Sequence, residues 1–181
     1  MSSKLYVLHH SKPEKIPGLA PAAWRLSRVG VMLAIPIAEA SFWSTVNAIY
    51  HCPALAAMQT AQIVAGRWQM PIRQVADLGR LPMQELTRGL LGQRAGSGNL
   101  HFDKDYTAAQ ERIVRCVHRL AQQNVGYSFA IVSHRRTIAA LYSHLLGRQI
   151  TREECRSLRM PDLSVVDLET WQVIDGFLCN K

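Results

Sequence analysis

Short apolar runs alternate along the chain with longer segments of helical pattern. Residues 5–8 and 128–132 are short, mostly apolar runs, which is typical of buried strands, and residues 46–50 are a second short strand. Residues 71–75 are a weaker strand candidate. Helical spacing or a high alanine content predicts helices over residues 27–33, 54–65, 106–123 and 137–146, with one more starting at residue 151. This alternation predicts an α/β protein, a three-layer α/β/α sandwich with a mostly parallel central sheet.

Capping and helix-breaking residues mark several of the expected helix ends. Ser27 is placed to cap the first helix, and Pro36 is placed to disturb its end. Gly66 is placed to stop the helix over residues 54–65. Residues 151–154, Thr-Arg-Glu-Glu, fit a capping box, which predicts the start of a further helix.

The C-terminal part of the chain has the pattern of a β-hairpin. Residues 163–168 and 171–174 are strand-like and flank a short polar turn. Residues 90–103 are instead rich in glycine and poor in apolar side chains, which predicts a surface loop. Because no repeat, coiled coil or linker interrupts the chain, we expect residues 1–181 to form a single domain.

Composition fits a folded domain with an affinity for anions. The chain has 181 residues, of which 48% are hydrophobic and 19% are charged, enough to build one continuous core. Its net charge is +8, which favours anionic partners. Arginine outnumbers lysine, and the guanidinium group suits bidentate contacts with phosphate or carboxylate. Charge alone leaves open whether the anion is a small phosphoester, a nucleic acid or a membrane surface.

Cysteine spacing and one apolar run bear on the cellular compartment. The four cysteines are scattered and form no C-x-x-C pair, which favours reduced thiols in a cytoplasm over a zinc ribbon or redox motif. Residues 29–38 are apolar and lead into Ala-Glu-Ala, a pattern similar to a signal-peptide cleavage site. The run follows a good strand and is too short to cross a bilayer, so we expect a cytoplasmic protein without membrane attachment.

Two of the apolar runs end in histidines. His9 and His10 follow the first run, and His134 comes shortly after the run that ends at Val132. Ligands of open α/β sheets bind beyond the carboxyl ends of the strands, so these histidines can converge on one pocket. A helical pattern follows His134, and a helix N-terminus offers backbone N–H groups to an anion. This arrangement predicts a site that holds or attacks a phosphate.

Four segments together resemble the histidine phosphatase superfamily, also called the phosphoglycerate mutase-like family. Residues 4–11, Lys-Leu-Tyr-Val-Leu-His-His-Ser, are similar to its opening strand and Arg-His-Gly motif. Residues 26–30 resemble its Leu-Thr-x-x-Gly, and residues 49–61 its segment Ile-Tyr-Ser-Ser-Pro-x-x-Arg-Ala-x-Gln-Thr-Ala. Residues 131–147 resemble its second histidine motif and the helix after it. The resemblance extends over almost the whole chain and implies the phosphoglycerate mutase-like fold.

The resemblance implies catalytic roles for three residues. His10 would be the nucleophile that forms a phosphohistidine, which splits one displacement into two. His134 would donate a hydrogen bond to the phosphoryl oxygens. Asp77, in the best match to the family's Leu-x-Glu pattern, would protonate the leaving oxygen. We therefore expect a phosphatase that acts on a phosphorylated small molecule or phosphoprotein without a metal or other cofactor.

The chain also departs from the family pattern. His9 and Ala56 stand where the family has arginines, and losing two guanidinium contacts weakens phosphate and transition-state binding by several kcal/mol. Cations and polar groups near the motifs are candidates to replace them. The predicted phosphate-binding residues are His9, Ser11, Lys12, His51, Arg135 and Arg136.

Two functions stay open from the sequence. The paired histidines favour a phosphatase, whereas the missing arginines favour a catalytically degraded member that binds a phosphorylated ligand or a protein partner. An arginine stripe on the helix over residues 106–123 is more typical of a solvated face than of a nucleic-acid site, so we do not expect nucleic acid as a partner. A metal site that included His51 would need a carboxylate or cysteine pattern, which the sequence lacks.

Overall fold

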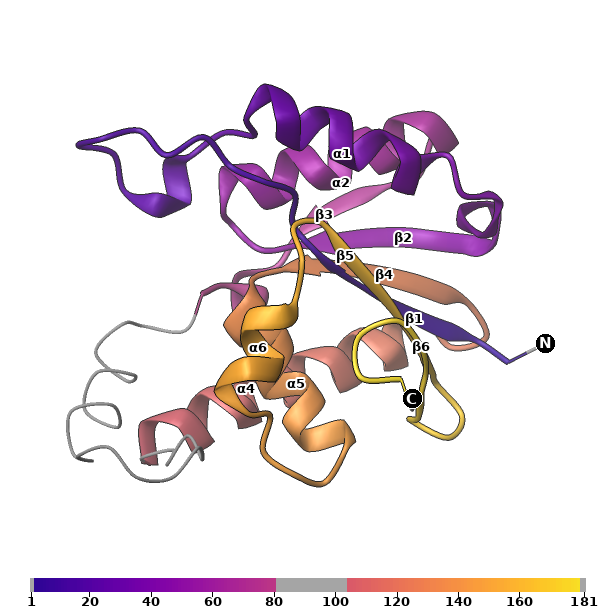
Figure 1. Ribbon diagram of the computed structural model, residues 1–181. Helices are drawn as coiled ribbons and strands as arrows, with labels where there is room; N and C mark the ends of the chain where they lie inside the picture. Colours follow the sequence, from indigo (N-terminus) through magenta and orange to yellow (C-terminus); the bar gives the residue numbers. More distant parts are fainter. Residues whose placement is uncertain (1, 81–103, 180–181) are drawn as a thin grey trace.

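A mixed six-stranded sheet forms the centre of the protein (Figure 1). The structure, a computed structural model, describes residues 2–80 and 104–179. The strand order is β3-β2-β4-β1-β5-β6. The strands are β1 (Lys4–His9), β2 (Val46–His51), β3 (Ile72–Gln74), β4 (Ser128–Ser133), β5 (Asp162–Asp167) and β6 (Val173–Asp175).

Helices cover both faces of this sheet. Figure 1 shows α1 (Arg28–Ala38) and α2 (Leu55–Trp68) on one face. The opposite face carries α4 (Lys104–Gln123), α5 (Arg135–Leu145) and α6 (Arg152–Ser157). Short 3₁₀ turns η1 (Pro21–Ala23), η2 (Ser41–Thr45) and η3 (Ala76–Leu78) join the larger elements. The expected three-layer α/β/α sandwich is confirmed.

The parallel part of the sheet brings three strand ends to one edge. β1 runs parallel to β4 with His9 opposite Ser133, and β4 runs parallel to β2 with Val132 opposite His51. The amide of His10 donates to the carbonyl of Ser133 over 3.1 Å. The residues that follow these strands therefore meet at one edge, as the sequence predicts.

The C-terminal hairpin gives the sheet its antiparallel side. β5 pairs antiparallel with β1, so that Asp162 lies opposite His9, and β6 then pairs antiparallel with β5. Because β5 begins where β1 ends, the residues just before β5 reach the edge that carries the histidines. Arg159 and Met160 arrive there in this way.

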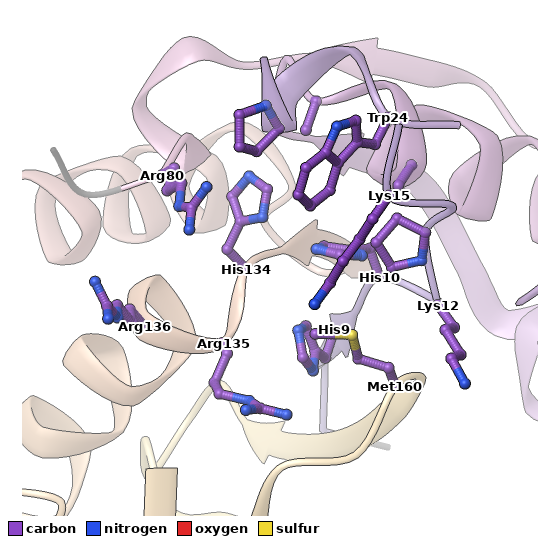
Figure 2. Close-up of a pocket in the computed structure, with 14 residues that line it drawn as sticks. His9, His10, Lys12, Lys15, Trp24, Arg80, His134, Arg135, Arg136 and Met160 are labelled. Atoms are coloured by element: carbon purple, nitrogen blue, oxygen red, sulfur yellow. The ribbon is translucent and has the colours of Figure 1, made fainter. Parts of the chain in front are cut away.

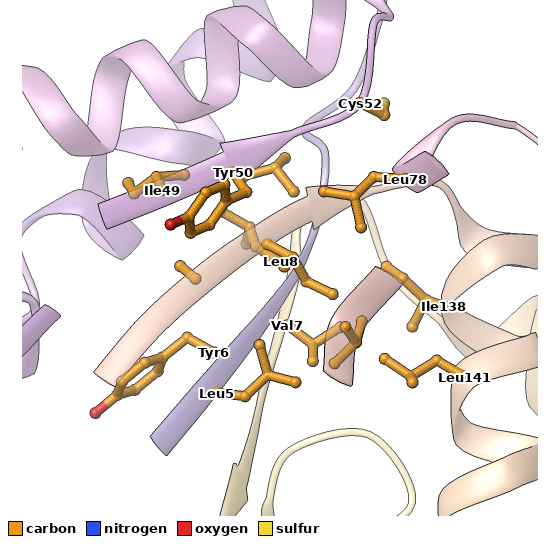
Figure 3. Packing of buried hydrophobic residues seen from close by; sticks show 14 of the residues in the cluster. Leu5, Tyr6, Val7, Leu8, Ile49, Tyr50, Cys52, Leu78, Ile138 and Leu141 are labelled. Carbon is orange, nitrogen blue, oxygen red and sulfur yellow. The ribbon is translucent and has the colours of Figure 1, made fainter. Parts of the chain in front are cut away.

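Apolar side chains of the central strands hold the layers together. Leu5, Leu8 and Ile131 are fully buried inside the sandwich, as are Ile138 and Leu141 of α5. Figure 3 shows these α5 side chains directed toward the side chains of β1. Burying a branched aliphatic side chain of this size stabilises the fold by about 1.5–3 kcal/mol.

The helix ends confirm some expectations and correct others. Ser27 accepts a hydrogen bond from the amide of Gly30 over 3.0 Å, and Thr151 forms the expected capping box with Glu154. Gly66 does not end α2, because the helix continues through it to Trp68. The C-cap residue that follows Trp68 is Gln69, whose φ of 53° lies in the left-handed region.

Two further boundaries differ from the sequence-based expectation. α1 passes through Pro36 and ends at Ala38, where the indole nitrogens of Trp43 and Trp68 donate to its last carbonyl groups. α5 begins at Arg135 instead of Thr137, directly after the second histidine.

The loop expected over residues 90–103 lies outside the described residues. None of the described helices is long and apolar enough to pass through a bilayer.

Candidate active site

A cavity of about 590 Å³ opens at the edge where the parallel strands end (Figure 2). His9, His10 and His134 line it and are called the histidine cluster below. Five cationic side chains also line it and are called the cationic set: Lys12, Lys15, Arg80, Arg135 and Arg136. The remaining lining residues are mostly apolar, and none of the described ones is acidic. The cavity is therefore suited to an anion.

His10 is held in one orientation and one tautomer. Its Nδ1 lies 2.8 Å from the carbonyl oxygen of Ser11. A carbonyl only accepts, so Nδ1 donates, and Nε2 of the neutral ring keeps its lone pair. The ring meets His134 edge to face, with centroids 5.0 Å apart. His10 thus presents an unprotonated nitrogen beside a second imidazole.

His134 occupies the point where β4 passes into α5. It is the N-cap residue of α5, although its side chain does not cap the helix. Its Nε2 lies 3.3 Å from Sγ of Cys52, a buried thiol that follows β2. Burial raises the pKa of Cys52 to about 11, so this thiol is protonated and serves as a hydrogen-bonding neighbour. The N-terminus of α5, the positive end of the helix dipole, follows this histidine directly.

His9 is tied to the C-terminal part of the chain. Its Nδ1 donates to the carbonyl oxygen of Arg159, and its Nε2 has no partner among the described residues. Since Nδ1 carries the proton, Nε2 is an acceptor and cannot donate to a phosphate oxygen. His9 therefore lines the cavity without offering it charge or a donor, which weighs against its predicted phosphate contact.

Burial keeps the histidine cluster neutral. Desolvation, followed by the repulsion of His10, lowers the pKa of both His9 and His134 to about 3. Desolvation also lowers the pKa of His10, and the charges of Arg80 and Arg135 push it in the same direction. Near neutral pH all three rings are uncharged, so the positive charge of the cavity comes from the cationic set.

The cationic set reaches the cavity from loops and from the start of α5. Arg135 donates from Nη2 to the carbonyl oxygen of Leu158 over 2.8 Å. Figure 2 shows Arg80 beside His134 and Lys15 extended toward the histidines, while Lys12 points away from them. Arg80 and Lys15 thus approach the histidine cluster from different segments, so an anion bound there meets positive charge from more than one element.

Three predicted site residues are not among those that line the cavity. The Ser11 hydroxyl donates a hydrogen bond to the carbonyl oxygen of Gly30 over 2.6 Å, and the Ser11 amide donates to the hydroxyl of Thr60. His51 is buried and its Nδ1 contacts the carbonyl of its neighbour over 2.8 Å. Asp77 instead forms an ion pair with Arg119 of α4, in which Oδ2 of the carboxylate lies 2.9 Å from Nη2 of the guanidinium. These placements do not support the phosphate contacts and the general-acid role expected for them.

Several lining residues were not anticipated. Lys15, Trp24 and Arg80 lie in irregular segments or turns, and Met160 lies just before β5. A signal existed for Arg80, because it follows the third parallel strand, whose carboxyl end shares the same edge. For Trp24 and Met160 no local pattern gives the direction of the loop, so the sequence offered no comparable signal.

Family and structural comparisons agree with this geometry. Residues 24–173 match the family described as the histidine phosphatase superfamily (branch 1), so the chain belongs to that superfamily. The matched range contains His134 and begins after His10. In sequence the chain matches no curated protein. Among the described residues no group of three or more His, Cys, Asp or Glu side chains could hold a metal ion.

Solved structures share the fold at low sequence identity. A phosphoserine phosphatase from Entamoeba histolytica, solved with 3-phosphoglyceric acid, has a TM-score of 0.73 and 18% identity, with 97% of this chain and 96% of that chain covered. YhfR from Bacillus stearothermophilus has a TM-score of 0.70 and 18% identity, with 95% and 94% covered. A mycobacterial glucosyl-3-phosphoglycerate phosphatase has a TM-score of 0.68 and 17% identity, with 99% and 100% covered.

Proposed function

We propose that this protein is a phosphatase that cleaves a phosphomonoester through a phosphohistidine at His10. The observation that carries the proposal is the orientation of His10. Its Nδ1 contact with Ser11 leaves a neutral Nε2 beside His134, inside a cavity bordered by cations. A neutral, oriented imidazole is the form that attacks phosphorus.

The reaction takes two displacements at phosphorus. In the first, the Nε2 lone pair of His10 forms an N–P bond, the ester P–O bond breaks, and the leaving oxygen takes up a proton from solvent. In the second, water attacks phosphorus and gives up a proton to solvent, the N–P bond breaks, and inorganic phosphate leaves with His10 neutral again. His134, the α5 N-terminus and the cationic set stabilise the charge on the phosphoryl oxygens in both steps.

Cavity size and lining support an ester group larger than phosphate. The cavity of about 590 Å³ exceeds the volume of one phosphate group, and Trp24, Pro21 and Met160 border its remaining space. We therefore propose a phosphorylated small molecule or a phosphorylated side chain of a protein as substrate. We also propose a cytoplasmic location, which the free state of the described cysteines supports.

One observation favours a second candidate function, binding without turnover. Ala56 lines the cavity at a position where the family has an arginine, and His9 brings no charge. A cavity weakened in this way still attracts anions through its cationic set. In this alternative the protein binds a phosphorylated ligand and leaves it intact.

Hydrolysis of para-nitrophenyl phosphate in metal-chelated buffer separates the two functions. A phenolate leaves readily, so this probe needs little help from a general acid. We expect phosphate release by the wild type, loss of at least about three orders of magnitude in His10→Ala, and little change in the matched control His118→Ala. His118 is exposed and is not among the cavity-lining residues.

Trapping of the intermediate completes the test. Rapid quenching in alkali should recover phosphate bound to a histidine of the wild type and none on His10→Ala. A wild type that binds phosphate but releases none from aryl phosphates between about pH 5 and 8, where imidazole titrates, would leave only the binding function.

A further inference from the structure

The outward face of α1 is apolar over its whole length. Val29, Met32, Leu33 and Ile35 are exposed by 52%, 62%, 44% and 44%, and Val31 by 39%. From Val29 to Ala38 the helix contains no charged residue. A helix on the outside of a sandwich normally carries polar side chains on that face, so this surface has the composition of an interface.

The inward face of α1 has the opposite composition. Its buried residues are the small Gly30, Ala34 and Ala38, one turn apart. At Gly30 an added Cβ would lie 2.1 Å from the carbonyl oxygen of Lys12, so the chain passes close to the helix there. Apart from Ile37, which packs against the core, the bulky side chains of α1 therefore contribute little to the protein's own core, although they are the larger part of the helix's apolar surface.

Two charged residues bracket this apolar face. Arg28 and Glu39, the C-cap residue, are exposed and form no ion pair among the described residues. At 100° per residue, Arg28, Met32, Ile35 and Glu39 fall on one stripe of the helix. Along α1 the stripe therefore begins with a positive residue, continues with two apolar residues and ends with a negative residue.

This order of charges makes the stripe complementary to itself. When two copies of α1 cross antiparallel about a two-fold axis, Arg28 of each copy lies opposite Glu39 of the other. Met32 of each copy then lies opposite Ile35 of the other, because both pairs of numbers are symmetric about the same midpoint. An isologous contact requires this kind of symmetry.

We propose that the outward face of α1 binds a second copy of this chain in an antiparallel α1–α1 contact. The paired charges favour this occupant over an anionic membrane, since Glu39 would be repelled by such a surface. A helix pair alone is smaller than the roughly 800 Å² per partner of a stable interface. The dimer is therefore reversible, with a dissociation constant in the micromolar range or weaker.

Sedimentation velocity of the full chain tests the contact. The experiment uses about 0.15 M salt, which screens the repulsion between two copies of net charge +8. We expect the wild type to dimerise as its concentration rises toward hundreds of micromolar. Met32→Glu should stay monomeric because it places two buried carboxylates at the centre of the contact. The matched control Val125→Glu, at an apolar residue exposed by 77% in the turn before β4, should dimerise as the wild type does.

A charge exchange tests the antiparallel arrangement. Arg28→Glu and Glu39→Arg each place like charges together at both ends of the contact, so each should weaken dimerisation about tenfold. The double variant Arg28→Glu/Glu39→Arg restores opposite charges and should return to near the wild-type affinity. All variants should keep the wild-type circular dichroism and thermal midpoint, since these side chains are exposed.

The outcomes decide between the occupants. A wild type that is monomeric at every concentration overturns the proposal, and binding of that monomer to phosphatidylserine vesicles would assign the face to a membrane. A double variant no better than the single ones overturns the antiparallel arrangement. These results are independent of the hydrolysis experiments, because α1 contributes no residue to the cavity.

Discussion

The two histidines that end β1 and the cations that reach the cavity from loops line one cavity, yet the chain holds them in opposite ways. His9 and His10 lie at the end of β1, are exposed by only 1% and 7%, and donate to nearby carbonyls. Lys15 and Arg80 come from irregular segments and are exposed. A nucleophile must be neutral and oriented, which burial achieves, whereas a side chain that attracts an anion keeps its charge best near water. The fold thus separates the reacting group from the groups that supply charge.

Removal of the second imidazole gives the largest expected effect beyond His10 itself. His134→Ala should lower kcat by about 10²–10³ because a donor to the phosphoryl oxygens is lost. Steady-state hydrolysis of an aryl phosphate measures this effect. Cys52→Ala, which removes the thiol beside His134 and leaves the ring, is the control and should cost less than about tenfold. Equal losses in both variants would mean that His134 acts only through its packing.

Removal of one charge from the cationic set should change binding more than turnover. Arg80→Gln should weaken inorganic phosphate as a competitive inhibitor by about tenfold, since one charge-assisted contact is lost. The KM for aryl phosphate should rise similarly, with a smaller change in kcat. Arg152→Gln removes an exposed arginine at the start of α6, outside the cavity lining, and should leave both constants unchanged. A fall in kcat alone would move Arg80 from the binding role to the chemical step.

Titration of the imidazoles tests the neutrality of the cluster. Long-range ¹H–¹⁵N spectra should show His9 and His134 neutral at pH 5, since the pKa of each is lowered to about 3. The urea-unfolded chain should instead titrate near the ordinary value of 6.5. Saturating phosphate should raise the pKa of His134, because a bound anion favours the imidazolium. Titration of these rings near pH 6.5 in the free folded protein would show that burial does not control them.

The same shift predicts an acid-dependent loss of folding stability. The pKa values are lower in the folded state, so below about pH 6.5 the unfolded chain binds more protons than the folded one. The stabilisation is complete above that pH and is lost as the pH falls toward about 3, by up to roughly 1.4 kcal/mol per pH unit for each proton. Urea midpoints measured between pH 7.5 and 5 should fall accordingly, and a flat profile would contradict the shift.

Periodicity predicted the framework of the fold. The runs that became β1, β2 and β4 are mostly apolar, with only Asn47 of β2 exposed among their central residues, and such runs are typical of strands buried in a parallel sheet. The Thr151 capping box is equally local, since its partners lie within one turn. Gly66 failed as a stop signal because glycine costs only about 1 kcal/mol inside a helix, which the packing of buried Val64 and Ala65 offsets.

The candidate site could be predicted only in part. The strand ends located His10 and His134, because topology alone brings carboxyl ends of parallel strands together. Proximity to the first motif suggested Ser11 and the match to a Leu-x-Glu pattern suggested Asp77, but the sequence does not show that the former turns toward α1 and the latter toward α4. Which way a side chain turns depends on partners that are distant in sequence, and periodicity carries no information about them.

The central position of β1 has a consequence for how the protein is made. β1 leaves the ribosome well before its neighbours in the sheet, because β4 and β5 end at Ser133 and Asp167. Until β4 has been synthesised, the apolar residues of β1 have no neighbouring strand to pair with, and long-range pairing of this kind folds slowly. The growing polypeptide thus carries His10 on an unpaired strand at least until β4 has been synthesised, so that the cavity assembles long after its nucleophile is made.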